Sequence, residues 1–343
     1  MKVVARTDEL TRDEWLEARS KGIGGSDAGT IMGINPYKSA WTLWAEKTGR
    51  ITDTFKGNEA TRLGQAFERP IAEQYAQMIA EDGLVVVAWP VLLQGKKEWQ
   101  LANVDFFICE YGNPHPDDNS YELGKVSDWR HSSPPPNRVG ILEVKTTGLA
   151  GRGNADQWGE NSVPATYRMQ GCHYASVTGI KDVTFACLIG GQGIVTRDVR
   201  YTQSEIDELT TIEEFFWWQV NFDEEPIADG GDLDALKKLY PKSTDQTVEV
   251  DEFLADIVAE YRVTKAALEE TEALLKKLRA QMEQAIGSAQ AVEWNGRLLY
   301  TFKSTKDSEA LDVKALQAEH PDIAAKFMKP KPGYRVLKVA SDD

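Results

Sequence analysis

Residues 254–285 follow a strict alternation of three- and four-residue steps between apolar or small side chains. Charged residues flank these positions through four heptads. Such a repeat predicts a long helix that buries a seam against a partner helix, in a helical hairpin or a coiled coil. We therefore expect a coiled-coil helical arm over residues 251–290, outside the globular core. The seam positions are Leu254, Ile257, Tyr261, Thr264, Leu268, Thr271, Leu275, Leu278, Met282 and Ala285.

The chain on either side of this arm divides into three further parts. Two alternating runs within residues 291–302 are joined by Asn295-Gly296, the strongest short signal for a β-hairpin. We therefore expect a small C-terminal module of a β-hairpin and a helix over residues 291–343. Residues 223–250 are interpreted as a linker. Residues 1–222 remain for one large domain, within the usual range of about 50–250 residues.

The net charge of −15 is unusual for a protein that binds nucleic acid, because phosphate affinity normally comes from Lys and Arg. The charge is unevenly distributed, however. Residues 201–286 contain 21 Asp and Glu against 8 Lys and Arg, which accounts for −13 of the total. The remainder of the chain is close to neutral, so a local basic groove is compatible with the composition.

Nothing in the sequence indicates a membrane or secreted protein. No apolar run approaches the roughly 20 residues that cross a bilayer, and residues 1–16 carry a charge every few residues and lack the apolar run of a signal peptide. The three cysteines, Cys109, Cys172 and Cys187, have no metal-ligand spacing. We expect a cytoplasmic protein without membrane contact.

The predicted elements of the large domain favour an α+β fold with a central mixed sheet flanked by helices. The first 80 residues are expected to be helical, with a Gly-rich interruption at residues 21–27. Residues 110–138, which are rich in Pro, Ser and Asp, are expected to form an exposed inserted loop. The later helices are expected at residues 58–80, 165–178 and 204–222, and the strands at residues 84–89, 100–109, 139–146, 183–189 and 194–200.

The predicted strand at residues 139–146 carries Glu143 and Lys145, two residues apart. Side chains at this spacing project from the same face of a strand. A carboxylate there could bind Mg²⁺, while the adjacent ammonium orients or deprotonates the attacking water. An acid-x-Lys triplet is a weak signal, because it is also typical of a surface ion pair. A second copy, Asp312-Val313-Lys314, precedes a helical pattern, and its Asp is better interpreted as an N-cap.

Two further acids are candidate metal ligands. Asp105 lies in a strand between Val104 and Phe106, where an unpaired buried carboxylate would be costly. Glu68 lies on a predicted helix beside Phe67. A turn or solvent-facing position for Asp105, and an exposed helical position for Glu68, are the alternatives.

The chain resembles the YqaJ-type viral recombinases, relatives of lambda exonuclease in the PD-(D/E)XK nuclease superfamily. The resemblance covers residues 10–220 and rests on motifs that are weak singly but specific as an ordered set. These motifs are Gly24-Gly25-Ser26-Asp27-Ala28, Asn35-Pro36-Tyr37-Lys38-Ser39, Leu43-Trp44, Lys47-Thr48-Gly49, Gly64-x3-Glu68, Val104-Asp105, Glu143-Val144-Lys145-Thr146 and Gln170-x3-Tyr174. The resemblance implies a restriction-endonuclease-like core.

The resemblance also implies roles for particular residues. Glu68 would bind metal directly or through water. Asp105 and Glu143, with the Val144 carbonyl, would hold two Mg²⁺ or Mn²⁺ ions. Lys145 would position or activate the water, with Gln170 in support. The remaining pair, Arg19 and Ser26, would bind a 5′-terminal phosphate. This last role also has a physical basis, because glycine-rich amides before a helix and an Arg fork both favour anions; an ordinary tight turn is the alternative.

One departure from the family pattern concerns the interval of 38 positions between Asp105 and Glu143. It is longer than the short hairpin expected from the resemblance. An inserted loop would account for the difference. Alternatively, an acid within the loop is the true ligand, and the candidates are Asp117, Asp118 and Asp128.

Together these features predict a phage- or prophage-type exonuclease that digests duplex DNA ends 5′→3′ in the bacterial cytoplasm. It would leave 3′ single-stranded tails for a single-strand annealing protein, and family precedent implies a ring trimer. A selective endonuclease with the same metal core is one alternative. A non-catalytic scaffold that binds a recombination partner through residues 251–286 is another.

Overall fold

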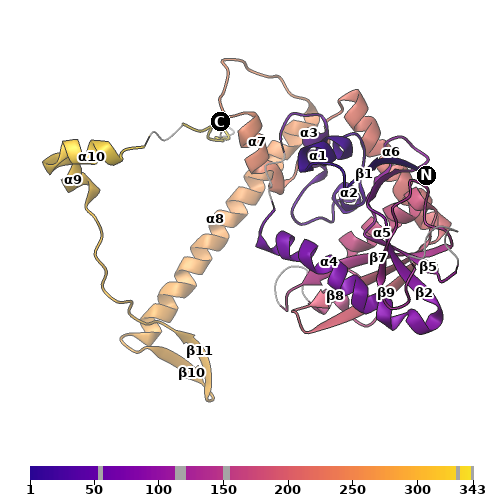
Figure 1. The fold of residues 1–343 in the computed structure, drawn as a ribbon. Coiled ribbons are helices and arrows are strands. Elements are labelled where there is room, and N and C mark those ends of the chain that lie inside the picture. Colours follow the sequence, from indigo (N-terminus) through magenta and orange to yellow (C-terminus); the bar gives the residue numbers. More distant parts are fainter. Residues whose placement is uncertain (53–56, 113–120, 150–154, 330–332, 341–343) are drawn as a thin grey trace. The chain divides into compact units, whose positions relative to one another are not determined.

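The computed structural model describes residues 1–52, 57–112, 121–149, 155–329 and 333–340. By its internal contacts the chain divides into two compact units, Met1–Leu239 and Tyr240–Asp343 (Figure 1). The first unit contains the sheets and every candidate site residue. The second contains the heptad helix and the hairpin.

The core of the first unit is a six-stranded sheet in the order β6-β2-β5-β7-β8-β9. The pairs β2–β6 and β7–β8 are parallel, and the other neighbours are antiparallel. The predicted α+β fold with a central mixed sheet is therefore confirmed. The strands are β2 (Leu84–Ala88), β5 (Phe106–Glu110), β6 (Val126–Asp128), β7 (Arg138–Thr147), β8 (Asp182–Ile189) and β9 (Gly193–Arg200).

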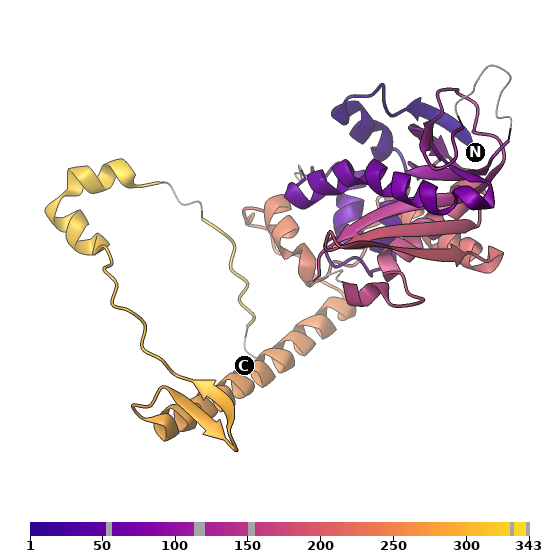
Figure 2. The same ribbon diagram turned by 60° about the horizontal axis from the view of Figure 1, so that its bottom comes forward.

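Helices cover both faces of this sheet (Figure 2). Helix α4 (Glu59–Met78) packs on one face, because alternate side chains of the strands, such as Val86 and Leu142, meet its apolar stripe. Helix α5 (Ala165–Thr178) covers the other face, with α6 (Gln203–Phe222) packed beside it. The period-2 alternation of each strand thus decides which helix its side chains meet.

A smaller three-stranded sheet, in the order β1-β3-β4, lies in the N-terminal part of the same unit. Its strands are β1 (Lys2–Arg6), β3 (Val91–Gln94) and β4 (Leu101–Ala102). The prediction of a wholly helical N-terminus was wrong for residues 2–6, because β1 pairs antiparallel with β3, a strand the sequence pattern did not indicate. The helices of this region are α1 (Arg12–Ser20), α2 (Gly25–Ile31) and α3 (Ala40–Lys47).

The predicted strand at residues 100–109 is two strands that belong to different sheets. Its first part, β4, pairs with β3 of the small sheet, and its second part, β5, pairs with β2 and β7 of the large sheet. Residues 103–105 form the crossing between them. Asp105 is therefore located at a junction of two sheets.

The expectation of an exposed loop over residues 110–138 was wrong for the part around residues 126–129, whereas most of residues 130–137 are exposed and outside regular structure. Val126 begins strand β6, which joins the sheet edge parallel to β2. Tyr121 and Trp129 are buried, and the Trp129 indole donates to the Ser133 carbonyl at 2.6 Å. Burial of these aromatic side chains outweighs the turn-forming composition of the segment.

The first unit extends to Leu239, beyond the boundary expected at residue 222. Part of the expected linker forms a 3₁₀ turn (Gly230–Asp232) and helix α7 (Leu233–Leu239). Asp232 is fully buried and accepts hydrogen bonds from the hydroxyls of Ser39 (2.5 Å) and Thr42 (2.6 Å). These bonds to α3 and its N-cap attach the segment to the first unit.

The second unit contains the long helix and the hairpin that the sequence predicted. Helix α8 (Glu252–Ile286) spans 35 residues. Strands β10 (Ala291–Trp294) and β11 (Arg297–Thr301) pair antiparallel, with positive φ at both Asn295 and Gly296, as a type I′ turn requires.

Two short helices, α9 (Val313–Glu319) and α10 (Pro321–Phe327), follow the hairpin. The Asp312 side chain accepts from the Ala315 amide, so the predicted N-cap is confirmed. Among the described residues, no helix is both long enough and apolar enough to span a bilayer.

Candidate active site

Glu143 and Lys145 project from the α5-facing side of β7, as the strand periodicity predicts. The Glu143 side chain is buried and that of Lys145 is partly buried, and Lys145 Nζ lies 2.5 Å from Glu143 Oε1. Gln170, on α5, donates from Nε2 to the same oxygen at 2.6 Å. Glu143 Oε1 thus receives two donors. The other oxygen, Oε2, is buried and has no hydrogen-bond partner among the described residues.

Asp105 reaches the same place from the crossing between the two sheets. Its Oδ2 accepts a hydrogen bond from the backbone amide of Val144 at 3.0 Å. Since Val144 lies between Glu143 and Lys145, this bond fixes the Asp105 carboxylate against the acid-x-Lys segment. The structure therefore brings together four predicted site residues, Asp105, Glu143, Lys145 and Gln170.

Glu68, near the middle of α4, is partly buried on the approach to this cluster. Burial and the negative charge of Asp105 raise the pKa of Glu68 to about 7, and the positive charge of Lys145 partly opposes them. Glu68 is close enough to interact electrostatically with Asp105 and Lys145. It belongs to α4, whereas Glu143 and Lys145 belong to a strand of the sheet.

The cluster holds more negative charge than its one lysine can neutralise. Burial and the Asp105 carboxylate raise the pKa of Glu143 to about 8, although Lys145 opposes the shift. Burial also raises the pKa of Asp105. In the opposite sense, burial disfavours the Lys145 cation, but Glu143 and Asp105 outweigh it and raise the pKa of the ammonium.

This donor set is suited to a hard divalent cation. It offers carboxylate oxygens, excess negative charge and an unpaired buried oxygen, Glu143 Oε2. Within the described residues, no three His, Cys, Asp or Glu side chains already form a complete ligand group. In this arrangement Lys145 and the Val144 amide occupy one oxygen each of Glu143 and Asp105.

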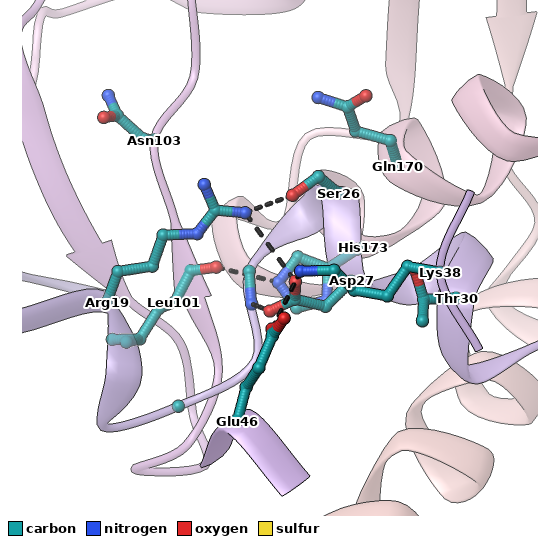
Figure 3. Close-up of polar contacts among 12 residues, drawn as sticks. Arg19, Ser26, Asp27, Thr30, Lys38, Glu46, Leu101, Asn103, Gln170 and His173 are labelled. Atoms are coloured by element: carbon teal, nitrogen blue, oxygen red, sulfur yellow. Dashed lines mark hydrogen bonds and ion pairs between the residues drawn. The ribbon is translucent and has the colours of Figure 1, made fainter. Parts of the chain in front are cut away.

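Arg19 and Ser26 form a second polar group, on α1 and α2. Arg19 donates to the Ser26 hydroxyl and lies 3.7 Å from Asp27 Oδ1 (Figure 3). Lys47 Nζ, 3.2 Å from Asp27 Oδ2, also donates to the carbonyls of Arg19 and Gly22. Burial opposes ionisation of Asp27, but Lys47, Arg19 and the Gly24 amide lower its pKa to about 2. A buried ion-pair network therefore holds the Gly-rich segment.

A cavity of about 800 Å³ is lined by one member of each polar group, Ser26 and Gln170. Helices α2 and α5 approach closely at Gly25, where a Cβ atom would lie 2.5 Å from the Tyr174 ring. Only glycine permits this approach, which places Ser26 beside Gln170. Tyr37 and Tyr167 also line the cavity, and Lys145 Nζ lies 4.8 Å from the centre of the Tyr167 ring.

Three neighbouring residues were not singled out for the site by sequence reasoning. Tyr174 accepts from Gln170 Nε2 at 2.9 Å and donates to the Asn103 carbonyl at 3.0 Å. Its position four residues after Gln170 on a helix was the available signal. Lys47 and His173 are buried polar residues whose partners are distant in sequence, so no local pattern indicates their contacts.

The alternative ligands in the loop differ in their outcome. Asp128 lies on edge strand β6 and forms an ion pair with Arg69, with Arg69 Nη1 2.7 Å from its Oδ1. It is therefore engaged elsewhere. Asp117 and Asp118 lie outside the described residues.

The first unit is thus an α+β domain whose central strand carries a buried acid-x-Lys pair next to two further carboxylates. The sequence of residues 14–181 matches the YqaJ-like viral recombinase domain. The predicted resemblance to this family is therefore confirmed.

Related proteins extend the comparison to most of the chain. The chain is 28% identical over 333 residues to a protein of Bacillus subtilis (strain 168) described as uncharacterized protein YqaJ. The match covers 95% of this chain and 94% of that protein. Both units are therefore within the matched region.

Two solved structures show weaker similarity. The alkaline exonuclease LHK-Exo from Laribacter hongkongensis is 18% identical, with a TM-score of 0.44 over 62% of this chain and 93% of that one. LHK-Exo in complex with dAMP is 17% identical, with a TM-score of 0.43 over 66% and 96%.

Proposed function

We propose that the protein is a metal-dependent exonuclease that degrades double-stranded DNA from its ends. The observation that carries the proposal is the convergence of Asp105, Glu143, Lys145 and Gln170, with Glu143 Oε2 buried and unpaired among the described residues. A buried carboxylate oxygen without a donor is costly unless a ligand satisfies it. A divalent cation would satisfy it.

In this proposal Glu68, Asp105 and Glu143, with the Val144 carbonyl, would hold Mg²⁺ or Mn²⁺, as two ions per site. The metal would supply polarisation of the phosphodiester and a more acidic bound water. Binding of cations would also favour the ionised carboxylates of Glu68 and Glu143, against the burial and the Asp105 charge that raise their pKa values.

Lys145 would act as a charged donor. Its pKa is raised, so Nζ stays protonated at neutral pH and can donate hydrogen bonds to the attacking water or to a phosphate oxygen. Fixed positive charge at the point where negative charge develops stabilises a transition state. Gln170 would hold the Glu143 carboxylate in place from α5.

The terminal phosphate of the digested strand would bind at Arg19 and Ser26. The Arg19 guanidinium is held in position for this role by Asp27, which also pairs with Lys47, and the Ser26 hydroxyl lies beside it. Recognition of a 5′ phosphate would give 5′→3′ digestion and leave 3′ single-stranded tails. A single-strand annealing protein in the cytoplasm of a bacterial host would bind these tails, and a ring trimer would enclose the duplex.

The test uses end-labelled linear duplex DNA incubated with and without Mg²⁺. We expect mononucleotides to appear progressively with Mg²⁺, and EDTA to abolish the reaction. Covalently closed circular DNA should remain intact, because it has no ends. Cleavage of the circle would indicate an endonuclease instead, and intact linear DNA under all conditions would indicate a non-catalytic scaffold.

Replacement of Arg19 by alanine should reduce the preference for 5′-phosphorylated over 5′-hydroxyl ends. The loss of one charge-assisted hydrogen bond predicts a reduction of about ten- to a hundredfold. Arg12→Ala is the matched control, since Arg12 is an exposed arginine on the same helix. Equal preference ratios for the two variants, measured from initial rates, would remove Arg19 from the phosphate site.

A further inference from the structure

Helix α8 exposes a continuous apolar stripe on its heptad seam. Among the described residues, its large seam side chains are 40–66% exposed. They are Leu254, Ile257, Tyr261, Leu268, Leu275, Leu278 and Met282. At 1.5 Å per residue the helix is about 52 Å long, and helices in water gain most of their stability from packing an apolar face. A stripe of this length indicates an interaction surface.

Hydrogen bonds from the described hairpin and C-terminal segment reach α8 near residues 282 and 262, on either side of the middle of this stripe. Tyr300 of the hairpin donates to the Met282 carbonyl near the C-terminal end of the helix, where Ile286 is buried. The strands β10 and β11 lie beside this end of α8 (Figure 1). The C-terminal segment contacts the helix at Arg262, which donates to the Ala340 carbonyl. Arg262 follows a seam position and is not itself on the seam.

We propose that α8 pairs with α8 of a second copy of this chain, in antiparallel orientation. This pairing does not depend on the proposed nuclease activity. The partner and its orientation are inferred from the sizes of the side chains along the seam. In heptad notation the a positions are Leu254, Tyr261, Leu268, Leu275 and Met282, and the d positions are Ile257, Thr264, Thr271, Leu278 and Ala285.

The sizes of these residues select the orientation. In a parallel pair each position faces its own copy, so Thr264 and Thr271 would form two threonine layers in the middle of the seam, with the Leu268 layer between them. In an antiparallel pair centred between residues 269 and 270, each a residue faces one d residue. The layers are then Leu254 with Ala285, Tyr261 with Leu278, Leu268 with Thr271, Leu275 with Thr264, and Met282 with Ile257. Three layers combine a leucine with alanine or threonine, and the other two pair two large side chains, so no threonine faces another threonine.

The charges beside the seam agree with this alignment. Lys265 and Glu272, both exposed, occupy e positions that face each other across an antiparallel pair. The twofold axis repeats the contact, which gives two Lys265–Glu272 ion pairs between the copies. In a parallel pair Lys265 would instead face Glu260.

The first test measures the mass of the full chain in solution at micromolar concentration. Leu268→Glu places charges in the central layers and should halve the mass of the assembly. Val263→Glu is the matched control, because Val263 is 72% exposed on the same helix but lies off the seam. Because the mass is compared between variants, the result holds whether the nuclease unit is itself a monomer or a ring trimer. Equal masses for wild type and L268E would overturn the proposal.

The second test uses charge exchange to determine orientation. K265E should weaken association on the order of tenfold, because two attractive contacts become repulsive. The double variant K265E/E272K should restore it, whereas rescue by K265E/E260K would show a parallel pair and overturn the orientation. DNA digestion by these variants should match that of wild type, which shows that the fold is retained.

Cross-linking provides an independent measurement of orientation. A mixture of L268C and T271C proteins should form an intermolecular disulfide on oxidation, and neither protein should form it efficiently alone. Efficient cross-linking of L268C by itself would contradict antiparallel pairing. The native Cys109, Cys172 and Cys187 are buried, so the wild-type chain provides the background.

Discussion

Lys145→Ala should reduce the digestion of linear duplex DNA by roughly a thousandfold, the loss typical when a preorganised transition-state donor is removed. The reason is local. Lys145 is the cation that contacts Glu143 directly, at 2.5 Å, and its ammonium is the donor nearest to the cluster of acids. Without it, the attacking water and the charge on the reacting phosphate would lose a fixed positive partner.

The sequence provides a control for this substitution. Lys314, in the second acid-x-Lys triplet, lies on α9, and its neighbour Asp312 caps that helix. Lys314→Ala should therefore leave the rate unchanged. DNA binding and circular dichroism should show that K145A is folded. Full activity of folded K145A would remove Lys145 from the reaction and with it the proposed role of the triplet.

Glu213→Ala should destabilise the first unit by about 3–5 kcal/mol, the usual cost of breaking a buried ion pair. Glu213 and His173 are fully buried, and His173 Nδ1 lies 2.7 Å from Glu213 Oε1. The other ring nitrogen, Nε2, lies 2.9 Å from the Leu101 carbonyl oxygen. Both nitrogens face acceptors, so only the protonated imidazolium can donate to both. The loss of Glu213 would leave that charge buried without a partner.

Urea unfolding of the nuclease unit measures this loss. Glu214→Ala is the control. Glu214 is the next residue in the sequence, and its carboxylate forms an exposed pair with Lys97, 2.6 Å away, which should contribute about 0–1 kcal/mol. Similar losses of stability in the two variants would contradict the assignment of a buried ion pair.

The same pair predicts a pH dependence. Burial disfavours the His173 cation, but the Glu213 carboxylate and the Leu101 carbonyl outweigh it and raise the pKa of His173 above 6.5. A raised pKa in the folded state contributes stability that is complete below about pH 6.5 and is lost as the pH rises through the raised value. The difference between wild type and E213A should therefore be largest near pH 6 and decrease at higher pH. A constant difference would argue against a charged His173.

The chemistry of the site was predictable because it depends on local periodicity. The two-residue spacing placed Glu143 and Lys145 on one face of β7, and the apolar neighbours of Asp105 indicated a carboxylate inside the core. Tyr174, four residues after Gln170, belonged to the same motif of the family resemblance, but no role in the site was predicted for it. Such spacings involve residues that are close together in the sequence, so they can be read without knowledge of the fold.

What the sequence did not predict depends on contacts between distant segments. Asp232 bonds Ser39 and Thr42, nearly 200 positions away, so a segment with linker composition belongs to the first unit. Strand β1 exists because β3 pairs with it, and β6 because β2 offers a sheet edge. Neither strand has a local pattern strong enough to identify it, since tertiary pairing decides short strands.

The crossing at residues 103–105 has a consequence for the robustness of the enzyme. Asp105 lies between strand β4 of the small sheet and strand β5 of the large sheet. Asn103, in the same crossing, accepts hydrogen bonds from the Trp15 indole of α1 and from the Tyr174 hydroxyl of α5. The position of the Asp105 carboxylate therefore depends on both sheets and on the bonds of Asn103. If the three-stranded sheet loosens at a temperature at which the six-stranded sheet is still intact, Asp105 will be displaced and the reaction will slow. On heating, activity should therefore be lost before the first unit unfolds.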